Sequence, residues 1–333
     1  MPDVSKTQYR CSVLMAAYNA ERYIAQSLDS LCAQTLAGVE IIVVDDSSTD
    51  ATLSIVRHYA DWHDNIRWLH LTENHGQAYA RNHALNHATG EYICFLDADD
   101  WYAPDALEQA VAVLDNNPET DCVLFDVMMC QEGKAAVPAK SETFDCLAGR
   151  EAFLKSLTWE IHGVYMVRAD IHRRYPYDDT CRCYSDDNTT RLHFYVARQV
   201  RSCRGRYYYR QHSSSMTHQI SVRYFDHMRA NESMKRQLIS LGVDDDILTL
   251  YENQRWLVVI DSYQFYFRHR HELSTCACRR GLAEMRRVWR TIEIDRLYAR
   301  NRYKFGYMPL RFSWQLFCIA EELYFLLKKA LKR

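Results

Sequence analysis

The stretch VEIIVVDD, from Val39 to Asp46, decides the fold class of this chain. Apart from Glu40, every residue before the two aspartates is apolar and β-branched. A strand that is apolar on both sides is typical of a parallel sheet whose two faces are covered by helices. Asp45 and Asp46 would then stand at the carboxyl end of the strand, where ligands bind in open α/β sheets.

Strand and helix signals alternate on both sides of this stretch through the first 130 residues. The other strand-like runs are Cys11–Tyr18, Ile66–Leu71, Glu91–Asp97 and Asp121–Met129. Helical patterns follow Asn19, Ser47 and Pro104, and another lies around Tyr79–Ala88. We expect Asn19 to cap its helix and Gly90 to end the helix before it. The alternation predicts an α/β fold with a Rossmann-like, mostly parallel sheet flanked by helices.

The pattern changes twice further along the chain. After Met129 the alternation loosens into a mixed region, and from about residue 222 the chain is mainly helical. We therefore predict an α/β domain over residues 1–220, with halves 1–130 and 131–220, and a helical C-terminal region over residues 221–333.

The last helical pattern, FSWQLFCIAEELYFLLKKALKR, ends in a cluster of cations. They are Lys328, Lys329, Lys332 and Arg333. Two interpretations stay open. The cations suit the negative end of the helix dipole, or they attach an amphipathic helix to an anionic membrane face. The sequence gives no signal for an oligomeric state.

The bulk composition is that of an ordinary globular enzyme. The chain has 333 residues, 48% hydrophobic and 25% charged, with a formal net charge of -2. This balance argues against a general nucleic-acid binder. The polar start MPDVSKTQYR is not a signal peptide and no long apolar run occurs, so we expect a cytoplasmic protein. Its 12 cysteines lack zinc-site spacing and are expected to be reduced thiols.

Polar residues follow three of the predicted strands. Tyr18 comes after the first strand, Asp46 after the second, and Asp97 to Asp100 after the fourth. Carboxylates spaced as in Asp97-Ala98-Asp99 can bind Mg²⁺ or Mn²⁺, which complete their shells with water and phosphate oxygens. No glycine-rich phosphate loop or dinucleotide turn is present. The pattern therefore predicts a nucleotide diphosphate site in which metal and side chains meet the phosphate charge.

Two longer segments contain these polar residues. They are CSVLMAAYNAERYIAQSLDSLCAQTLAGVEIIVVDDSSTD and HGQAYARNHALNHATGEYICFLDADDWYAPDALE. Both resemble the family 2 glycosyltransferases of bacterial surface-polysaccharide pathways. The similarity is specific over roughly residues 9–110 and more diffuse to about residue 215. It implies a GT-A fold, a nucleotide-sugar donor, a Mn²⁺ or Mg²⁺ cofactor and transfer of a hexose with inversion.

The resemblance assigns the donor site residue by residue. Ala17 and Tyr18 would lie against the base, Asp46 would bind the base edge with Asp45 beside it, and Arg81 would lie near the diphosphate. Of the Asp97-Ala98-Asp99 motif, Asp99 would contact the metal directly, and Asp97 would hold the ribose or a metal-bound water. Asp100 is expected to support the following turn.

The segment SDDNTTRLHFYVAR resembles the part of the family that carries the catalytic base. Asp186 stands at the usual Glu position and Asp187 at the Asp position. We expect Asp187 to be the base, with Asp186 or a plain helix cap as the alternatives. Trp159 and His162 stand where relatives carry an acceptor motif, so these two residues and Asp186 are candidate acceptor contacts.

The segment YYYRQHSSSMTH resembles a loop that closes over the diphosphate. Arg210, His212, Ser215 and His218 are its candidate phosphate or metal contacts, with His212 the third metal ligand beside Asp97 and Asp99. A solvated serine-rich surface loop is the alternative.

The resemblance implies an inverting, metal-dependent transferase. It would move a hexose from a UDP-sugar to a glycan or polyprenyl-linked acceptor in cell-surface polysaccharide biosynthesis. A sugar nucleotidyltransferase would show a glycine-rich loop after the first strand, which MAAYNAERY lacks. A non-catalytic nucleotide-sugar-binding partner is the other alternative. Donor sugar, acceptor and linkage are not written in these motifs.

Overall fold

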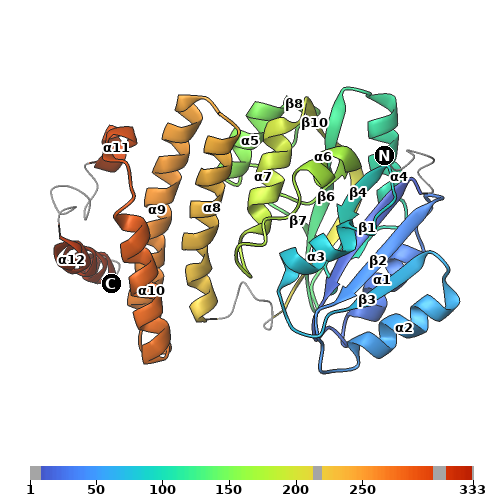
Figure 1. Ribbon diagram of the computed structural model, residues 1–333, viewed down its shortest axis with the longest axis horizontal. Coiled ribbons are helices and arrows are strands. Elements are labelled where there is room, and N and C mark those ends of the chain that lie inside the picture. Colours follow the sequence, from blue (N-terminus) through green and yellow to red (C-terminus); the bar gives the residue numbers. More distant parts are fainter. Residues whose placement is uncertain (1–8, 213–219, 303–312, 332–333) are drawn as a thin grey trace. The chain divides into compact units, whose positions relative to one another are not determined.

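The computed structural model describes residues 9–212, 220–302 and 313–331. Ser215, His218, Lys332 and Arg333 lie outside these ranges. By its own contacts the chain divides into two compact units (Figure 1). One comprises Met1–Arg182 with Asp186–Ser215, and the other Cys183–Ser185 with Met216–Arg333.

The first unit is built on a mixed sheet whose described strands run in the order β3-β2-β1-β4-β9-β6-β10-β5. The strands are β1 Cys11–Ala17, β2 Val39–Asp45, β3 Ile66–His70, β4 Tyr92–Phe95, β5 Trp101–Tyr102, β6 Thr120–Gln131, β7 Val137–Pro138, β8 Cys146–Ala148, β9 Tyr165–Arg168 and β10 Gln199–Gln211. The strands from β3 to β4 are parallel to one another, and so are β6 and β10. Between them β9 runs antiparallel to β4 and β6, a strand that the sequence pattern did not reveal.

Helices cover both faces of this sheet, as the apolar strands predicted (Figure 1). They are α1 Ile24–Cys32, α2 Thr52–Trp62, α3 Gln77–Leu85, α4 Ala106–Asn116, α5 Gly149–Leu157, α6 Ala169–Arg174 and α7 Asp186–Val196. Val13 and Met15 of β1 join one core with residues of α1, α2 and α4. Leu14, between them, is also fully buried and points to the opposite face, where α3 contacts β1. The α/β fold with a flanked sheet is thus confirmed.

Glu40, near the start of β2, links this strand to β1. Glu40 is buried, accepts a hydrogen bond from Ser12 Oγ at 2.5 Å and another from the Thr89 N–H at 2.8 Å. Gly90 donates its N–H to the same Ser12 hydroxyl, and a Cβ at Gly90 would lie 2.5 Å from the Ser12 nitrogen. Gly90 is therefore required by close approach to β1. The expectation that it ends the helix was wrong, because α3 already ends at Leu85.

Asn19 does not cap the first helix, contrary to expectation. Helix α1 begins at Ile24, and Asn19 has a left-handed φ of 49°. Its side-chain Oδ1 accepts the Thr49 N–H at 2.8 Å, and its own N–H donates to Ser48 Oγ at 3.0 Å. Asn19 thus joins the segments that follow β1 and β2, a tertiary contact that outcompeted local capping.

The second unit is helical over the described residues. Its helices are η2 Val222–Phe225, α8 Asp226–Ser240, α9 Asp245–His269, α10 Thr275–Trp289, η3 Ile294–Arg296, α11 Ala299–Arg302 and α12 Trp314–Leu331. An aromatic core includes Trp256, Trp289 and Phe317. Beside it, the buried Arg255 forms ion pairs with Glu252 and Glu232. None of the described helices is long and apolar enough to cross a membrane. The cysteines are all free thiols.

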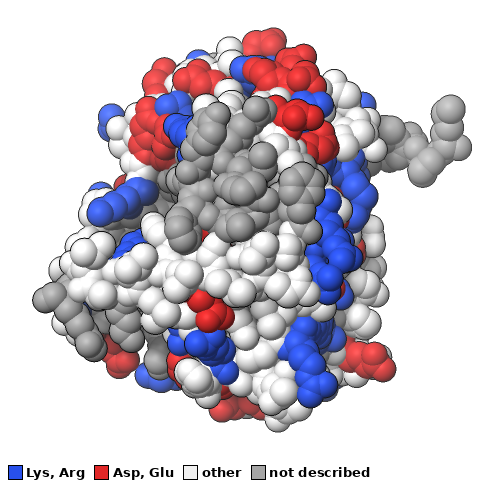
Figure 2. Space-filling view, turned by 90° about the vertical axis from the view of Figure 1, so that its left-hand side faces the viewer, with Lys and Arg blue, Asp and Glu red and all other residues white. Residues whose placement is uncertain are grey.

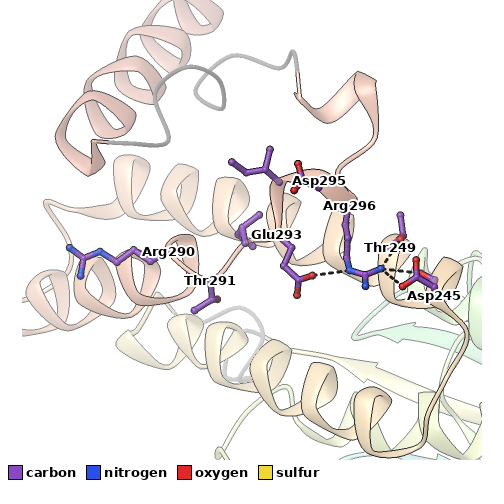
Figure 3. A pocket seen from close by; sticks show the side chains of 9 residues that line it. Asp245, Thr249, Arg290, Thr291, Glu293, Asp295 and Arg296 are labelled. Carbon is purple, nitrogen blue, oxygen red and sulfur yellow. Dashed lines mark hydrogen bonds and ion pairs between the residues drawn. The ribbon is translucent and has the colours of Figure 1, made fainter.

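A polar cavity of about 700 Å³ lies in the helical unit between the start of α9 and the segment after α10 (Figure 3). Arg296 forms ion pairs inside it with Asp245 at 2.7 Å and Glu293 at 2.8 Å, and donates to Thr249 Oγ1 at 3.2 Å. The contacts of Arg296 thus join η3 to the start of α9 across this cavity.

Glu321 provides a test of the helical core. It is buried, and neither carboxylate oxygen has a hydrogen-bond partner among the described residues. Burial raises its pKa to about 7, above the value of about 4.3 in an unfolded chain. The unfolded state therefore gives up this proton first, and the free energy of unfolding falls as the pH rises from about 4 to about 7.

Glu321→Gln should consequently raise the free energy of unfolding of the helical unit by about 1–3 kcal/mol above pH 7 and leave it unchanged near pH 4. Urea denaturation followed across this pH range measures the effect. Glu322→Gln is the matched control, because Glu322 pairs with Arg270 at 2.9 Å and its neutralisation should not stabilise. Equal behaviour of the two variants would contradict this account.

Candidate functional site

The carboxyl ends of β1 and β2 bring Tyr18 and Asp46 side by side. Ala17 and Asp45 are register partners in this parallel pair, and the Asp46 N–H donates to the Ala17 carbonyl at 2.8 Å. Tyr18 is 48% exposed at this edge. Its ring is available to a ligand, as an aromatic platform for a base requires.

The two aspartates after β2 hold the neighbouring loop. Asp46 is buried, and its two carboxylate oxygens accept the N–H groups of His75 and Gly76, each at 2.8 Å. Asp45 lies 2.8 Å from His70 Nδ1. These bonds fix the approach to α3, so in this structure Asp46 organises the rim of the site. Contact of Asp46 with a base edge stays a prediction.

Arg81 of α3 is the buried cation of the site. It is 1% exposed, and Nη2 donates to Asp97 Oδ1 at 2.5 Å while its guanidinium lies 4.1 Å from the Phe95 ring centroid. Gln77, one turn earlier on α3, donates to the same oxygen at 3.0 Å. Burial raises the pKa of Asp97 to about 6; Arg81 opposes this, and the charges of Asp99 and Asp186 add to it.

Asp99 turns outward toward β10. Its Oδ2 lies 2.8 Å from His212 Nε2, and its carbonyl accepts a hydrogen bond from Arg210 Nε at 2.8 Å. The Arg210 guanidinium lies 4.8 Å from the ring centroid of Tyr23 and 4.7 Å from that of Trp101. A carboxylate, an imidazole and a guanidinium from two distant segments therefore meet beyond the end of β4.

Asp100 supports the site from beneath through β10, whereas the sequence predicted a role in the turn that follows it. It is buried and accepts hydrogen bonds from the Tyr207 hydroxyl and the Arg210 N–H, both at 2.7 Å. Burial raises the pKa of this carboxyl well above its usual value, and the charges of Asp97 and Asp99 add to that effect. Asp100 thus anchors the end of β10, which carries Arg210 and His212.

The acidic pair at the start of α7 approaches the same cation. Asp186 Oδ2 lies 3.9 Å from Arg81 Nη1. The pKa of Asp187 is raised to about 7, mainly by burial and also by the charge of Asp186, while Arg191 opposes the rise. Arg81 therefore stands between the two acidic segments, Asp97 to Asp99 on one side and Asp186 with Asp187 on the other.

The candidate acceptor residues differ in accessibility. Trp159 is 58% exposed in a left-handed backbone conformation with φ 59°, and the Arg191 guanidinium lies 5.5 Å from its ring centroid. Burial lowers the pKa of His162 to about 4, and its Nδ1 accepts the Val164 N–H at 3.2 Å. Trp159 is the residue that a ligand can reach, whereas His162 is held as a neutral imidazole in the fold.

The donor set fits a hard divalent cation bound through few protein ligands. No group of three or more His, Cys, Asp or Glu side chains within the described ranges is arranged to enclose a metal ion. Asp99 and His212 form a pair, while Asp97 is paired with Arg81. Magnesium and manganese commonly take one or two protein ligands and obtain the rest from phosphate and water. Asp99 and His212 are therefore the residues that would hold the ion.

Sequence reasoning missed three residues of this arrangement. Gln77 lies four residues before Arg81, so the two share a face of α3, and that spacing was a usable signal. Tyr207, which supports Asp100, and Arg191, which lies beside Asp187 and Trp159, reach the site only through the fold.

The first half of the chain is similar in sequence to known proteins. Residues 12–175 match the profile of Glycosyl transferase family 2. This part of the chain belongs to that family. It is 34% identical over 169 residues to EpsE of Bacillus subtilis, named as a glycosyltransferase, covering 49% of this chain and 58% of EpsE. It is 38% identical over 109 residues to the Escherichia coli glucosyltransferase WfgD, covering 33% of this chain and 42% of WfgD. The chain thus matches about half of the length of these relatives.

Solved structures resemble this chain over most of its length. S. aureus TarS, residues 1–349 in complex with UDP-GlcNAc, superposes with a TM-score of 0.69 at 20% sequence identity. The alignment covers 95% of this chain and 88% of the TarS chain. At this identity the likeness establishes the shared fold.

Arg81 gives a direct test of the site's electrostatics. Arg81→Met leaves the Asp97 carboxylate without its cation, so the free energy of unfolding of the α/β unit should fall by about 3 kcal/mol. Adding Asp97→Asn should recover part of the loss, because the orphaned charge is removed. Urea denaturation measures both. Arg22→Met is the control, since its 3.6 Å ion pair with Glu132 joins exposed side chains. A loss no greater than in Arg22→Met would contradict the central role of Arg81.

Proposed function

We propose that this chain transfers a hexose from a nucleotide diphosphate sugar to a hydroxyl of a glycan or lipid-linked oligosaccharide, with inversion, in cell-surface polysaccharide biosynthesis. One observation carries the proposal. The buried Arg81 lies within ion-pair distance of both Asp97 and Asp186, so the donor-side acids and the acid pair containing Asp187 meet at one edge of the sheet.

A UDP-sugar is the donor that the supporting observations favour. Tyr18 offers an exposed ring beside the ends of β1 and β2. WfgD is named as using UDP-Glc and a diphosphoundecaprenol-linked sugar, and TarS has been solved with UDP-GlcNAc. By analogy with those two proteins, we assign binding of the uracil ring to Tyr18. Asp46 would position the loop beside that ring.

The diphosphate would be met by Arg210 and by the cation that Asp99 and His212 hold. Arg210 is oriented between Tyr23 and Trp101, so little rotamer freedom is lost when it binds an anion. A bound Mn²⁺ or Mg²⁺ supplies positive charge that offsets the charge developing on the departing nucleotide. Asp97 would hold Arg81 in place through their ion pair, and it would also accept a hydrogen bond from the ribose.

Asp187 is the proposed base. In an inverting displacement the acceptor oxygen forms a bond to the anomeric carbon as the bond to the diphosphate breaks, and the hydroxyl proton passes to the base. A carboxyl with a pKa of about 7 accepts this proton more readily than an ordinary aspartate. Asp186 raises that pKa and Arg191 limits the rise, so these two neighbours help to set the pKa of Asp187.

The acceptor would approach over Trp159. An exposed aromatic ring is a natural platform for a sugar, and Arg191 lies close to both Trp159 and Asp187. Asp186, on the same helix turn as Asp187, is the further polar contact. His162 would act indirectly, by shaping the backbone near Val164.

The base assignment predicts a pH dependence. Below pH 7 Asp187 is protonated and cannot accept a proton, so kcat/KM should fall about tenfold per pH unit on the acid side and level off above pH 7. Asp187→Asn should lower kcat by about 1,000-fold with little change in the donor KM.

Asp186→Asn is the matched control for the base. Removing this like charge should move the acid limb to lower pH while transfer persists. Near-normal transfer by Asp187→Asn, or loss of transfer in Asp186→Asn alone, would contradict the assignment.

Donor and metal are tested together. Incubation with UDP-, GDP- and dTDP-sugars plus Mn²⁺, with detection of released nucleotide, should identify a UDP-sugar. Calorimetry with UDP and Mn²⁺ should show binding weakened about tenfold or more by Asp99→Ala and by His212→Ala, since each removes a charged or metal-binding group. Asp105→Ala, an exposed acid at the start of α4, should bind normally. Turnover or binding of no sugar nucleotide would refute the proposal.

A further inference from the structure

Helix α12 carries apolar residues on two opposite faces. Phe317, Ala320 and Phe325 are buried in the helical unit. A second set recurs every three or four residues along the outside of the helix, the spacing of one helical face. This outer face consists of Leu316, Ile319, Leu323, Tyr324, Leu326, Leu327 and Leu331, all of them exposed. So many exposed large apolar side chains on one helix mark an interaction surface.

Glu321 and Glu322, the two acidic residues of α12, do not belong to this outer face. Glu321 is buried on the inner side, and Glu322 forms an ion pair with Arg270 at 2.9 Å. Lys328, by contrast, is exposed at the edge of the face, and its Nζ lies 5.8 Å from the Tyr324 ring centroid. A lysine bordering an apolar stripe can extend its ammonium group to a polar boundary while its stem stays on apolar surface.

The neighbouring helix α10 adds cations. The ring centroids of Trp289 on α10 and Trp314 on α12 are 5.7 Å apart, so the two helices are neighbours. Arg286 of α10 is close enough to Cys318 of α12 for its charge to counteract the rise that burial causes in the pKa of that thiol. Helix α10 has a single acid, Glu284, which already pairs with Arg287 and Arg229. Figure 2 shows the result as a white band with blue residues beside it, while red residues gather most densely at the top of the view.

We infer that the outer face of α12 docks in the plane of an anionic lipid surface. Its apolar side chains would enter the boundary between headgroups and acyl chains, and the cations beside it would lie at the level of the anionic headgroups. A second copy of this chain is less well matched. A two-fold contact through this face would offer its cations no acids, because the partner would present the same acid-poor face.

The test uses the full chain and vesicles of phosphatidylcholine with or without phosphatidylglycerol, without any sugar nucleotide. The wild-type chain should float with the vesicles, more strongly when phosphatidylglycerol is present. Ile319→Ser/Leu323→Ser/Leu327→Ser should weaken binding at least about tenfold. Each of these side chains is more than half exposed, so the fold should survive. Ile239→Ser, an equally exposed residue of α8, is the matched control and should bind like the wild type.

A second variant separates charge from apolar burial. Arg279→Gln/Arg280→Gln changes two exposed arginines of α10 and should reduce binding about fivefold per arginine, only to vesicles that contain phosphatidylglycerol. Equal binding to both vesicle types, or unchanged binding of the triple variant, would overturn the inference. So would a wild-type dimer that the triple variant converts to a monomer without any vesicle binding. Because nucleotide release from a soluble donor is a separate readout, failure here leaves the proposed transfer reaction standing.

Discussion

The α/β unit depends on one buried cation. Arg81 lies on α3, is almost completely shielded from solvent, and contacts Asp97 after β4 and Asp186 at the start of α7. Three segments that are far apart in the sequence thereby share one charge. A buried guanidinium without acidic partners would be strongly unfavourable, and so would the acids without it. Each of the three segments can hold its position because the other two are in place.

Arg81 does not fully neutralise the acids around it, and the remaining negative charge bears on the proposed reaction. Burial raises the pKa of Asp97 to about 6 and that of Asp187 to about 7. Excess negative charge of this kind destabilises the isolated protein and is relieved by a cation or by uptake of a proton. The same surplus suits the two tasks that we propose for the site, which are to attract a divalent cation and to accept a proton.

The helical unit follows another logic. Its interior is aromatic and contains the ion pairs of Arg255, whereas α12 presents a second apolar face outward. A helix that only completed the core would need one apolar face. The outer stripe and the cations beside it therefore make function, rather than stability, the better explanation of this sequence pattern.

Much of the α/β unit could be predicted from the sequence. The apolar strands, their order along the chain and the polar residues after each strand followed from local patterns. The similarity to family 2 suggested Asp97, Asp99 and Asp187 as candidate site residues. Local rules failed where a tertiary contact was stronger. Asn19 bonds to Thr49 instead of capping α1, and Gly90 is fixed by close approach to Ser12. Strand β9 went unnoticed because four residues give little periodicity.

The sequence by itself determined the fold class through its periodicity, and its resemblance to a known family singled out the acids that we propose for metal binding and proton transfer. Only the tertiary structure decided what each acid does. Asp46 holds a loop, Asp100 anchors β10, and Asp97 pairs with Arg81. The reason is physical. An aspartate's role depends on its burial and on the donors around it, and those donors come from segments that only folding brings together.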